Sequence, residues 1–197
     1  MFTPTFPSGC PYIVSVGATQ LKPSYTLTQG SNKTGAEVAA ATKIYSGGGF
    51  SNVFSVPDYQ KSALKTYFAA HDPPYGADRF NTSQSSRGHP DVSANGVNFV
   101  SVVNGETKLL YGTSAATPTF AAILTLINQA RMNVGKSSVG FVNPVFYQFP
   151  ELFNDVTEGV NPGCGTEGFE AVDGWDPVTG LGTPDFQRLL EKYLELP

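Results

Sequence analysis

Charged residues are scarce in this sequence, and histidine, cysteine and tryptophan are scarcer still. Asp, Glu, Lys and Arg make up only 14% of the 197 residues, and the formal net charge is −4. Because lysine and arginine form no cluster, the sequence argues against a nucleic-acid or anionic-membrane partner. No apolar run is long enough to cross a bilayer. The hydrophobic content of 40% is too high for a disordered chain.

The two cysteines are too few to define a disulfide scaffold, although Cys10 and Cys164 could pair in one bridge. Residues 2–8 have neither the basic nor the apolar segment of a signal peptide, so none is expected here. Sequons at Asn32 and Asn81 are candidate N-glycosylation sites. The sequons and the composition together favour a secreted protein.

Glycine and proline are abundant, with 21 and 15 residues, which indicates a loop-rich α/β or β-containing protein. The length suits a sizeable core, and we expect a single domain over 1–197 because no linker or repeat interrupts it. The apolar run 11–16 predicts a buried strand of a parallel sheet. The polar residues 20–46 predict a surface loop with an edge strand. Helices are predicted over 59–70, from Asn143 and over 184–194.

An Asn-Gly pair at 104–105 lies between two β-rich runs, 97–103 and 106–110. Both positions of a tight hairpin turn need positive φ, which Asn and Gly tolerate, so the pair predicts a hairpin. Downstream, apolar residues recur at helical spacing from Phe120 to Ile127 and alanines fill the other side. A buried helix is therefore predicted there, with Pro118 in or near its first turn.

Gly112, Thr113 and Ser114 lie at the junction of this hairpin and this helix. A helix N-terminus offers unpaired N–H groups and a positive field, which suit an alkoxide or a tetrahedral oxyanion. Gly112 would let a substrate approach the backbone, because it has no Cβ. A serine here is also a common helix N-cap. These residues alone leave Ser114 as either a nucleophile or a cap.

Three consecutive glycines, Gly47, Gly48 and Gly49, form a second candidate segment. Such a run exposes the backbone and imposes turns, which fits either a flexible loop or a substrate-lining loop. Neither histidine is a strong candidate for a catalytic residue. His89 precedes a proline and is expected in a turn rather than as a catalytic base, and His71 is expected at a solvated helix end.

Two aspartates on glycine-rich loops, Asp155 and Asp176, form a third candidate site. Carboxylates with free carbonyls between them fit the hard oxygen shell that Ca²⁺ prefers. A pair of Asx-turns would use the same residues without a metal. The residues themselves leave both interpretations open.

Five segments in order resemble the sedolisin family, the serine-carboxyl peptidases with a subtilisin-like fold, and agree best with its fungal tripeptidyl-peptidase-like members. The resemblance implies an α/β, partial subtilisin-like fold with a mostly parallel sheet flanked by helices and a C-terminal calcium-binding loop region. Each segment is short, but the ordered set is specific and covers nearly the whole chain. The segments are Phe6–Thr19, Ser46–Asn52, Arg87–Val92, Gly112–Pro118 and Gly174–Pro184.

The resemblance implies that Ser114 is the nucleophile and that its neighbours form the substrate and oxyanion loops, namely Gly112, Thr113 and residues 47–49. The chain would belong to the C-terminal part of the peptidase unit. The family's activating glutamate, its orienting aspartate and its oxyanion aspartate all precede the segment that begins here at Phe6. The only Glu-x-x-x-Asp match, Glu151 to Asp155, follows the serine and is interpreted as coincidence.

The resemblance also implies a Ca²⁺ site. Asp155 and Asp176 would supply side-chain oxygens, and Val156, Val172 and Gly174 would supply backbone carbonyls. Val172 stands where relatives usually have glycine. Its carbonyl can serve only if the local backbone angles suit a β-branched residue.

Three hypotheses follow. In the first, the chain is part of a secreted acid peptidase that is inactive without an N-terminal half of the same unit, because an isolated serine hydroxyl is a poor nucleophile. In the second, it is a non-enzymatic binding or effector protein on a truncated fold. In the third, it is a subtilisin-type Ser-His-Asp hydrolase. The sequence offers no convincing catalytic histidine for this third hypothesis. Missing strands would leave an exposed edge, through which the chain could form a homodimer.

Overall fold

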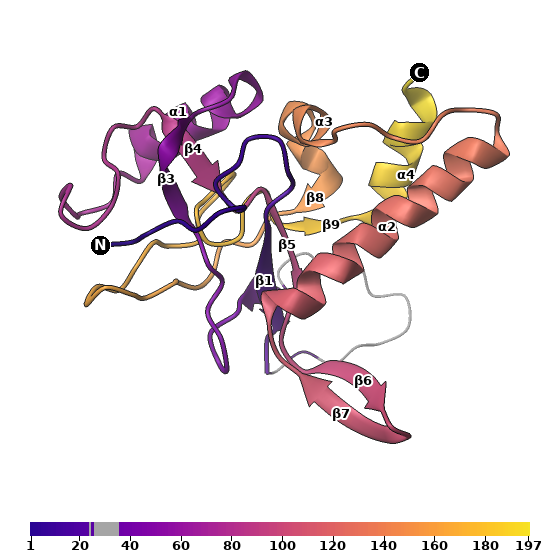
Figure 1. Cartoon of the computed structure of the whole chain (residues 1–197), viewed down its shortest axis with the longest axis horizontal. Coiled ribbons are helices and arrows are strands. Elements are labelled where there is room, and N and C mark those ends of the chain that lie inside the picture. Colours follow the sequence, from indigo (N-terminus) through magenta and orange to yellow (C-terminus); the bar gives the residue numbers. More distant parts are fainter. Residues whose placement is uncertain (24, 26–35) are drawn as a thin grey trace.

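A three-stranded sheet lies at the centre of the molecule, and the computed structural model describes it within residues 1–23, 25 and 36–197 (Figure 1). The central strand is β1 (Val16–Leu21). It pairs in parallel with β5 (Val92–Asn95) and antiparallel with the edge strand β2 (Glu37–Ala39). The edge strand predicted within 20–46 is therefore confirmed.

The strand predicted over 11–16 is wrong, because β1 begins where that run ends. The backbone N–H of Ser15 donates to Oδ2 of Asp91 at 2.7 Å and so does not join a strand ladder. Residues 17 and 18 are small and fit against the neighbouring serines: a Cβ at Gly17 would lie 2.5 Å from Ser93 Oγ and 2.6 Å from Ser46 Oγ. Close packing of small residues, rather than a long apolar run, positions this strand.

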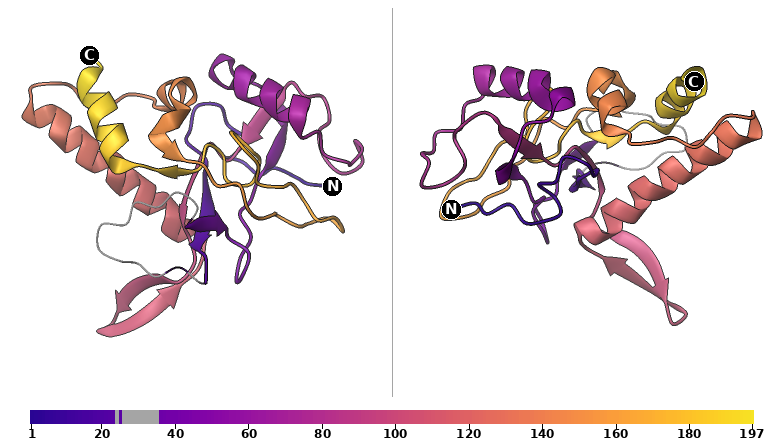
Figure 2. Two further views of the ribbon diagram at one scale, coloured as in Figure 1. Left: turned by 180° about the vertical axis from the view of Figure 1, so that it is seen from behind. Right: turned by 45° about the horizontal axis from the view of Figure 1, so that its top comes forward.

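The long helix α2 (Thr113–Asn133) covers one side of this sheet and packs against α4 (Phe186–Glu195) (Figure 2). The inward side of α2 is buried and includes Phe120 and Ile127. The outward side is exposed, and Leu126 keeps 57% of its surface accessible. The prediction of a buried helix is therefore right for one face and wrong for the other, although the sequence is apolar around the helix.

A second packing unit surrounds the strands β3 (Gly49–Ser55) and β4 (Ser86–His89), which pair antiparallel. The short helix η1 (Asp58–Gln60) leads into α1 (Lys61–Ala70), as the sequence predicts, and His71 ends α1 in an exposed position. Phe50 is the centre of an aromatic core. Its ring lies 4.9–6.1 Å from the rings of Tyr67, Phe68, Phe80, Phe169 and Trp175.

The hairpin of β6 (Phe99–Val103) and β7 (Glu106–Leu110) projects from the body beside the start of α2 (Figures 1 and 2). Its turn residues Asn104 and Gly105 have φ values of 54° and 80°. The hairpin prediction is confirmed, including the positive φ at both turn positions. Its side chains are largely exposed, and β7 is exposed along its whole length.

The C-terminal third contains α3 (Asn143–Gln148), η2 (Pro150–Leu152) and the two-residue strands β8 (Phe153–Asn154) and β9 (Thr183–Pro184). Both helices predicted in this part are present, with α4 beginning after an Asp185 side chain that accepts from the Arg188 N–H. No helix within the described ranges has both the length and the apolar character of a membrane span.

One expectation about the framework is wrong. The sheet is not mostly parallel, since β1–β5 is the single parallel pairing between the described strands and the others are antiparallel. Glycine- and proline-rich connections keep the strands short, at two to seven residues. The bridge that the sequence leaves open is not formed: Cys10 and Cys164 are both free thiols. Cys164 lies exposed at φ 54° in a tight turn of its own loop.

Candidate active site

Ser114 is the second residue of α2 and is exposed to solvent. The cap position belongs to Gly112, whose backbone has φ 145° and ψ 152°, so the interpretation of Ser114 as an N-cap is wrong. Its Oγ makes no hydrogen bond with any described residue. Pro118 is the sixth helical residue rather than a first-turn residue, and without an N–H it leaves the Ser114 carbonyl without its usual helical partner.

A cavity of about 540 Å³ opens beside this serine. Gly112, Thr113 and Ser114 form one part of its lining, and Gly47 and Gly48 form another. Gly49, predicted with them, instead begins β3 at φ +145° and faces the Phe169 ring. None of the described residues that line the cavity is Asp, Glu, Lys or Arg. The cavity therefore contains a hydroxyl nucleophile candidate but no carboxylate that could act as its base.

The glycine segment is held in place by the loop that precedes β9. Ser46 Oγ accepts the Ala18 N–H at 3.0 Å and donates to the Val178 carbonyl at 2.5 Å. A Cβ on Gly48 would overlap the carbonyl oxygen of Pro177, so this close backbone approach requires glycine. The segment is thus fixed by its neighbours, which does not fit a flexible loop, and its role in lining a substrate site stays a prediction.

His89 lines the same cavity but makes no hydrogen bond with Ser114. Its ring is buried at the end of β4, and Nε2 has no partner among the described residues. Burial, together with the nearby positive charge of Arg87, lowers the pKa of His89 to about 4. Asp91 lies two residues after His89 and is the nearest carboxylate in sequence that could orient its ring. Its Oδ2 accepts a hydrogen bond from the Arg87 guanidinium instead. The expectation that His89 is no catalytic base agrees with this arrangement.

The five residues predicted for a metal converge within one loop region. The Gly174 N–H donates to Asp155 Oδ2 at 2.7 Å, and the Val172 N–H donates to Asp176 Oδ2 at 3.2 Å. Thr179 Oγ1 lies 3.2 Å from the Val156 carbonyl and 3.2 Å from Asp176 Oδ2. Val156, the fifth predicted residue, is therefore next to the same loop. Val172 is not among the residues with positive φ, so its backbone suits a β-branched side chain.

The two carboxylates differ in exposure: Asp176 is fully buried, whereas Asp155 lies at the surface. Burial raises the pKa of Asp155, and burial raises the pKa of Asp176 to about 7 against the opposing effect of its N–H donors. Neither forms an ion pair with a described Lys, Arg or His. No group of three or more His, Cys, Asp or Glu suited to a metal occurs in the described ranges, so a cation here would depend on backbone carbonyls. The donor chemistry fits a hard cation such as Ca²⁺.

The remaining predicted residues lie apart from the cavity. Glu151 and Asp155 do not line it, in agreement with the interpretation of their spacing as coincidence. Asn32 lies outside the described residues. The Asn81 side chain donates to the Ser51 carbonyl at 2.7 Å and accepts the Ser83 N–H at 3.0 Å, and glycosylation there stays a prediction.

Sequence reasoning missed the buried polar network behind the cavity. Arg87 and Asp91 form a fully buried ion pair with a 2.6 Å N–O distance. Asp91 also accepts from the Tyr147 hydroxyl at 2.9 Å, and that hydroxyl accepts from Gln60 at 2.6 Å. The sequence contains one indication of this network: Arg87 and Asp91 carry opposite charges and lie four residues apart, with Pro90 between them, in a chain that has few charged residues. The cavity wall formed by residues 2–5 left no sequence signal at all.

Comparison with known proteins gives a consistent result. The model of the subtilase family matches residues 3–140. The chain is 47% identical to aorsin of Aspergillus oryzae and 47% identical to tripeptidyl-peptidase sed1 of Aspergillus fumigatus; each match covers 100% of this chain and 31% of the relative. It is 40% identical to human tripeptidyl-peptidase 1 over 98% of this chain and 33% of that protein. The chain thus spans about a third of the length of these curated relatives.

A solved structure shows the same fold. Pseudomonas sedolisin, a serine-carboxyl proteinase in complex with two molecules of pseudo-iodotyrostatin, superposes with a TM-score of 0.72 at 26% identity. The superposition covers 95% of this chain and 47% of that one. The short strands and the long serine-bearing helix described above are therefore part of a subtilisin-like α/β fold.

Proposed function

Because this chain belongs to the subtilase family and is similar to its sedolisin members, we propose that it is the nucleophile-bearing part of a serine-carboxyl peptidase, with Ser114 as the nucleophile. One observation carries the proposal. The Ser114 Oγ is exposed and unpaired at the start of α2, and it borders a cavity whose other wall is a fixed glycine segment. Gly112, Thr113 and the amides of the first helical turn would stabilise the oxyanion.

The activating base would come from outside this chain. A serine hydroxyl needs a base to become nucleophilic, and the described cavity lining contains no carboxylate. We propose that an N-terminal half of the same peptidase supplies it, and that the complete unit cleaves peptides at acidic pH, where a carboxylate with a raised pKa shares a proton with serine. The chain alone is then inactive, and the parent protein is secreted.

The exposed apolar surface beside the site supports such a partner. Val100, Val102 and Leu109 share one face of the projecting hairpin, and Leu126 is exposed on the outward side of α2. Apolar faces of this kind are covered in a complete domain. A homodimer through the same surface is the alternative way to cover it.

Complementation tests this proposal. This chain is mixed with the N-terminal half of the aorsin catalytic unit, and cleavage of a fluorogenic tripeptide amide is followed at acidic pH. Activity that needs both chains, and that disappears in Ser114→Ala, supports the peptidase. No cleavage, in a mixture in which both chains are folded and associated, overturns it and favours a non-enzymatic binding protein.

A second part of the proposal is that Ca²⁺ binds the loop of Asp155 and Asp176, with the carbonyls of Val156, Val172 and Gly174. The cation would neutralise the buried carboxylate of Asp176 and the exposed carboxylate of Asp155, and would fix the loop that supports Gly48. A ligand bound only to the folded state at a hundredfold excess over its Kd adds about 2.7 kcal/mol of stability. Chelation should therefore lower the Tm of the wild type but not that of Asp176→Asn, and an unchanged wild-type Tm contradicts the site.

A further inference from the structure

A second pocket, here called the C-terminal pocket, lies at the other end of α2 from Ser114. Its volume is about 370 Å³, and it shares no lining residue with the cavity beside Ser114. Arg131 lines it from the last turn of α2, roughly 25 Å along the helix from Ser114. The loop 137–142 and residues 196–197, which follow α4, also line it. The C-terminal pocket is therefore separate from the proposed peptidase site.

Arg131 brings a positive charge to this pocket, although the residue is only 3% exposed. Four of the five N–H groups of its guanidinium donate to main-chain carbonyls, which leaves one N–H on Nη2 without a described partner. These carbonyls belong to Ser137, Tyr193, Leu196 and Pro197. The N–H groups are thus largely satisfied, but carbonyls carry only partial charges.

Lys136 adds a second positive charge beside the same residues. Its Nζ donates to the carbonyls of Leu194 and Leu196 at 2.6 and 2.7 Å. Neither Arg131 nor Lys136 forms an ion pair with a side-chain carboxylate of a described residue. Both α2 and α4 end here, and each helix C-terminus carries about half a negative charge, so the two ends offset about one of the two positive charges. Positive charge therefore remains available to an anion.

Hydroxyl groups without partners line the C-terminal pocket as well. Tyr193 is 3% exposed, and its hydroxyl oxygen is buried without a hydrogen bond to any described residue. A buried hydroxyl that stays unpaired costs free energy, so this group has an unused capacity to donate. The hydroxyls of Ser137 and Ser138 are exposed and have no described partner either. No described Asp or Glu lines the pocket, so its polar part suits an anion.

The rest of the lining is apolar and includes Val139, Val142 and Val145, of which Val142 is 4% exposed. Pockets for small molecules have volumes of about 300–1,000 Å³, so this one suits a small ligand. An inorganic anion would leave the apolar walls in water, whereas a ligand with one charged and one apolar end would cover both parts. About one unit of unneutralised positive charge matches a carboxylate better than a doubly charged phosphate.

We propose that the C-terminal pocket binds an amphiphilic monocarboxylate, whose carboxylate accepts from the free Nη2 N–H of Arg131 and from the Tyr193 hydroxyl while its apolar chain packs against Val139, Val142 and Val145. The inference goes beyond the proposed function and does not depend on it. A medium-chain fatty acid and the C-terminus of an apolar peptide both present this chemistry. Either ligand would bind only to the folded chain and would raise its Tm.

Isothermal titration calorimetry of this chain with matched probes tests the inference. Octanoate is the reference ligand. Octanamide keeps the chain and removes the charge, so we expect about tenfold weaker binding. Hexanoate lacks two methylene groups, and we again expect about tenfold weaker binding. N-acetyl-Leu-Val and its amide form a second matched pair, and the tighter of the two carboxylates shows whether a fatty acid or a peptide terminus is the better source.

Variants separate ligand binding from folding. Arg131 is kept, because its side chain holds residues 193–197. Tyr193→Phe removes a hydroxyl that has no partner, so octanoate should bind about three- to tenfold more weakly while the denaturant midpoint does not fall. Ser138→Asp should weaken octanoate binding about two- to fivefold and Ser138→Lys should tighten it by a similar factor, with no such effect on octanamide. Ser62→Asp is the control, since Ser62 is exposed and lies outside the pocket.

NMR titration locates the ligand. On addition of octanoate, amide shifts should change in the loop 137–142 and at the end of α4, while those of residues 112–114 should stay constant. Three results would overturn the inference: no binding of either carboxylate at about 10 mM, equal affinities for octanoate and octanamide, or shifts confined to residues 112–114. Each of these measurements uses this chain alone, so its outcome is independent of whether complementation yields a peptidase.

Discussion

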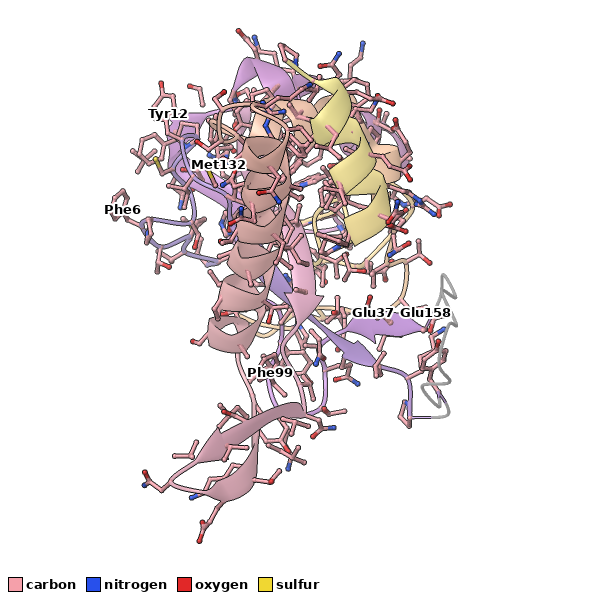
Figure 3. All side chains as sticks on the ribbon, turned by 90° about the vertical axis from the view of Figure 1, so that its right-hand side faces the viewer. Phe6, Tyr12, Glu37, Phe99, Met132 and Glu158 are labelled. Carbon is pink, nitrogen blue, oxygen red and sulfur yellow. The ribbon has the colours of Figure 1, made fainter. Side chains whose placement is uncertain are left out.

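The two sides of the cavity differ in how far this chain completes them. Behind it, the Arg87–Asp91 pair is fully buried, and Asp91 has additional donors in Ser15 and Tyr147. In front of it, the start of α2 and the adjoining hairpin are exposed, and Phe6 and Tyr12 project outward from the N-terminal segment (Figure 3). The first region pairs its buried charges with each other, although Arg87 Nε and His89 Nε2 have no partner among the described residues, whereas the second leaves apolar side chains and the Ser114 hydroxyl exposed.

The difference indicates which parts of the molecule are scaffold and which are interface. A buried charge needs a counter-charge, and Asp91 supplies one to Arg87 within this chain. Exposed apolar residues carry no such requirement and can be completed from outside. A substitution should therefore destabilise the isolated chain on the scaffold side, and affect association or chemistry on the open side.

Breaking the scaffold should give the largest effect. Asp91→Asn leaves the Arg87 guanidinium buried without a counter-charge, and we expect a loss of about 3–5 kcal/mol in the free energy of unfolding. Denaturant titration followed by circular dichroism measures it. The exposed pair of Asp58 and Lys61 is the control, and Asp58→Asn should leave the midpoint unchanged. Equal midpoints for both variants would contradict the comparison.

Two adjacent residues of α2 test the same contrast on one helix. Ile127 is fully buried, and Ile127→Ala should cost about 2–5 kcal/mol because it leaves a cavity. Leu126 is mostly exposed, and Leu126→Ala should change the stability of the isolated chain by less than about 0.5 kcal/mol. The same Leu126 substitution should instead weaken association with the N-terminal half, measured by calorimetry. A strong effect on the isolated chain would mean that this face is already covered.

Acid should destabilise the scaffold through His89. Its pKa is about 4 in the folded state against 6.5 for the ordinary side chain, so the unfolded chain binds the proton first as the pH falls. The stability contribution is complete above pH 6.5 and is lost as the pH falls through 4, a change of about 3 kcal/mol. His89→Gln should remove this part of the pH dependence, whereas His71→Gln should leave it intact. Parallel stability–pH curves for His89→Gln and wild type would refute the assignment.

The smallest effect on stability is expected at the nucleophile candidate. Ser114 is exposed, and its hydroxyl makes no hydrogen bond with a described residue, so Ser114→Ala should shift the free energy of unfolding by less than about 0.5 kcal/mol. The same variant should abolish the reconstituted peptidase activity. A large loss of stability would place Ser114 in the scaffold instead.

Local signals in the sequence predicted those features that local chemistry determines. The Asn104-Gly105 pair predicted the hairpin because its turn needs positive φ at both residues, and both have it. Local patterns single out Gly47, Gly48 and Ser114, and all three line one cavity in the structure. The helices followed from their apolar spacing.

Features that depend on distant residues were not predictable. The strand placed at 11–16 begins only at Val16, and the Ser15 N–H before it donates to the side chain of Asp91, 76 residues away in sequence. The wall formed by residues 2–5 depends on packing such as that of Phe2 on Phe169, at 5.1 Å between ring centroids. One apolar face of α2 stays exposed because nothing in the described part of the chain covers it. The sequence of the helix alone does not show which face that is.

The contact between Gly48 and the Pro177 carbonyl joins the cleft to the aspartate loop through backbone alone. A substrate in the cavity and a cation beside Asp176 would each further restrict the motion of one side of this contact. Two ligands that order touching segments favour each other, and the coupling free energy is the same in both directions. The peptide affinity of this molecule should therefore rise with calcium concentration, and its calcium affinity should rise with peptide, although neither ligand touches the other.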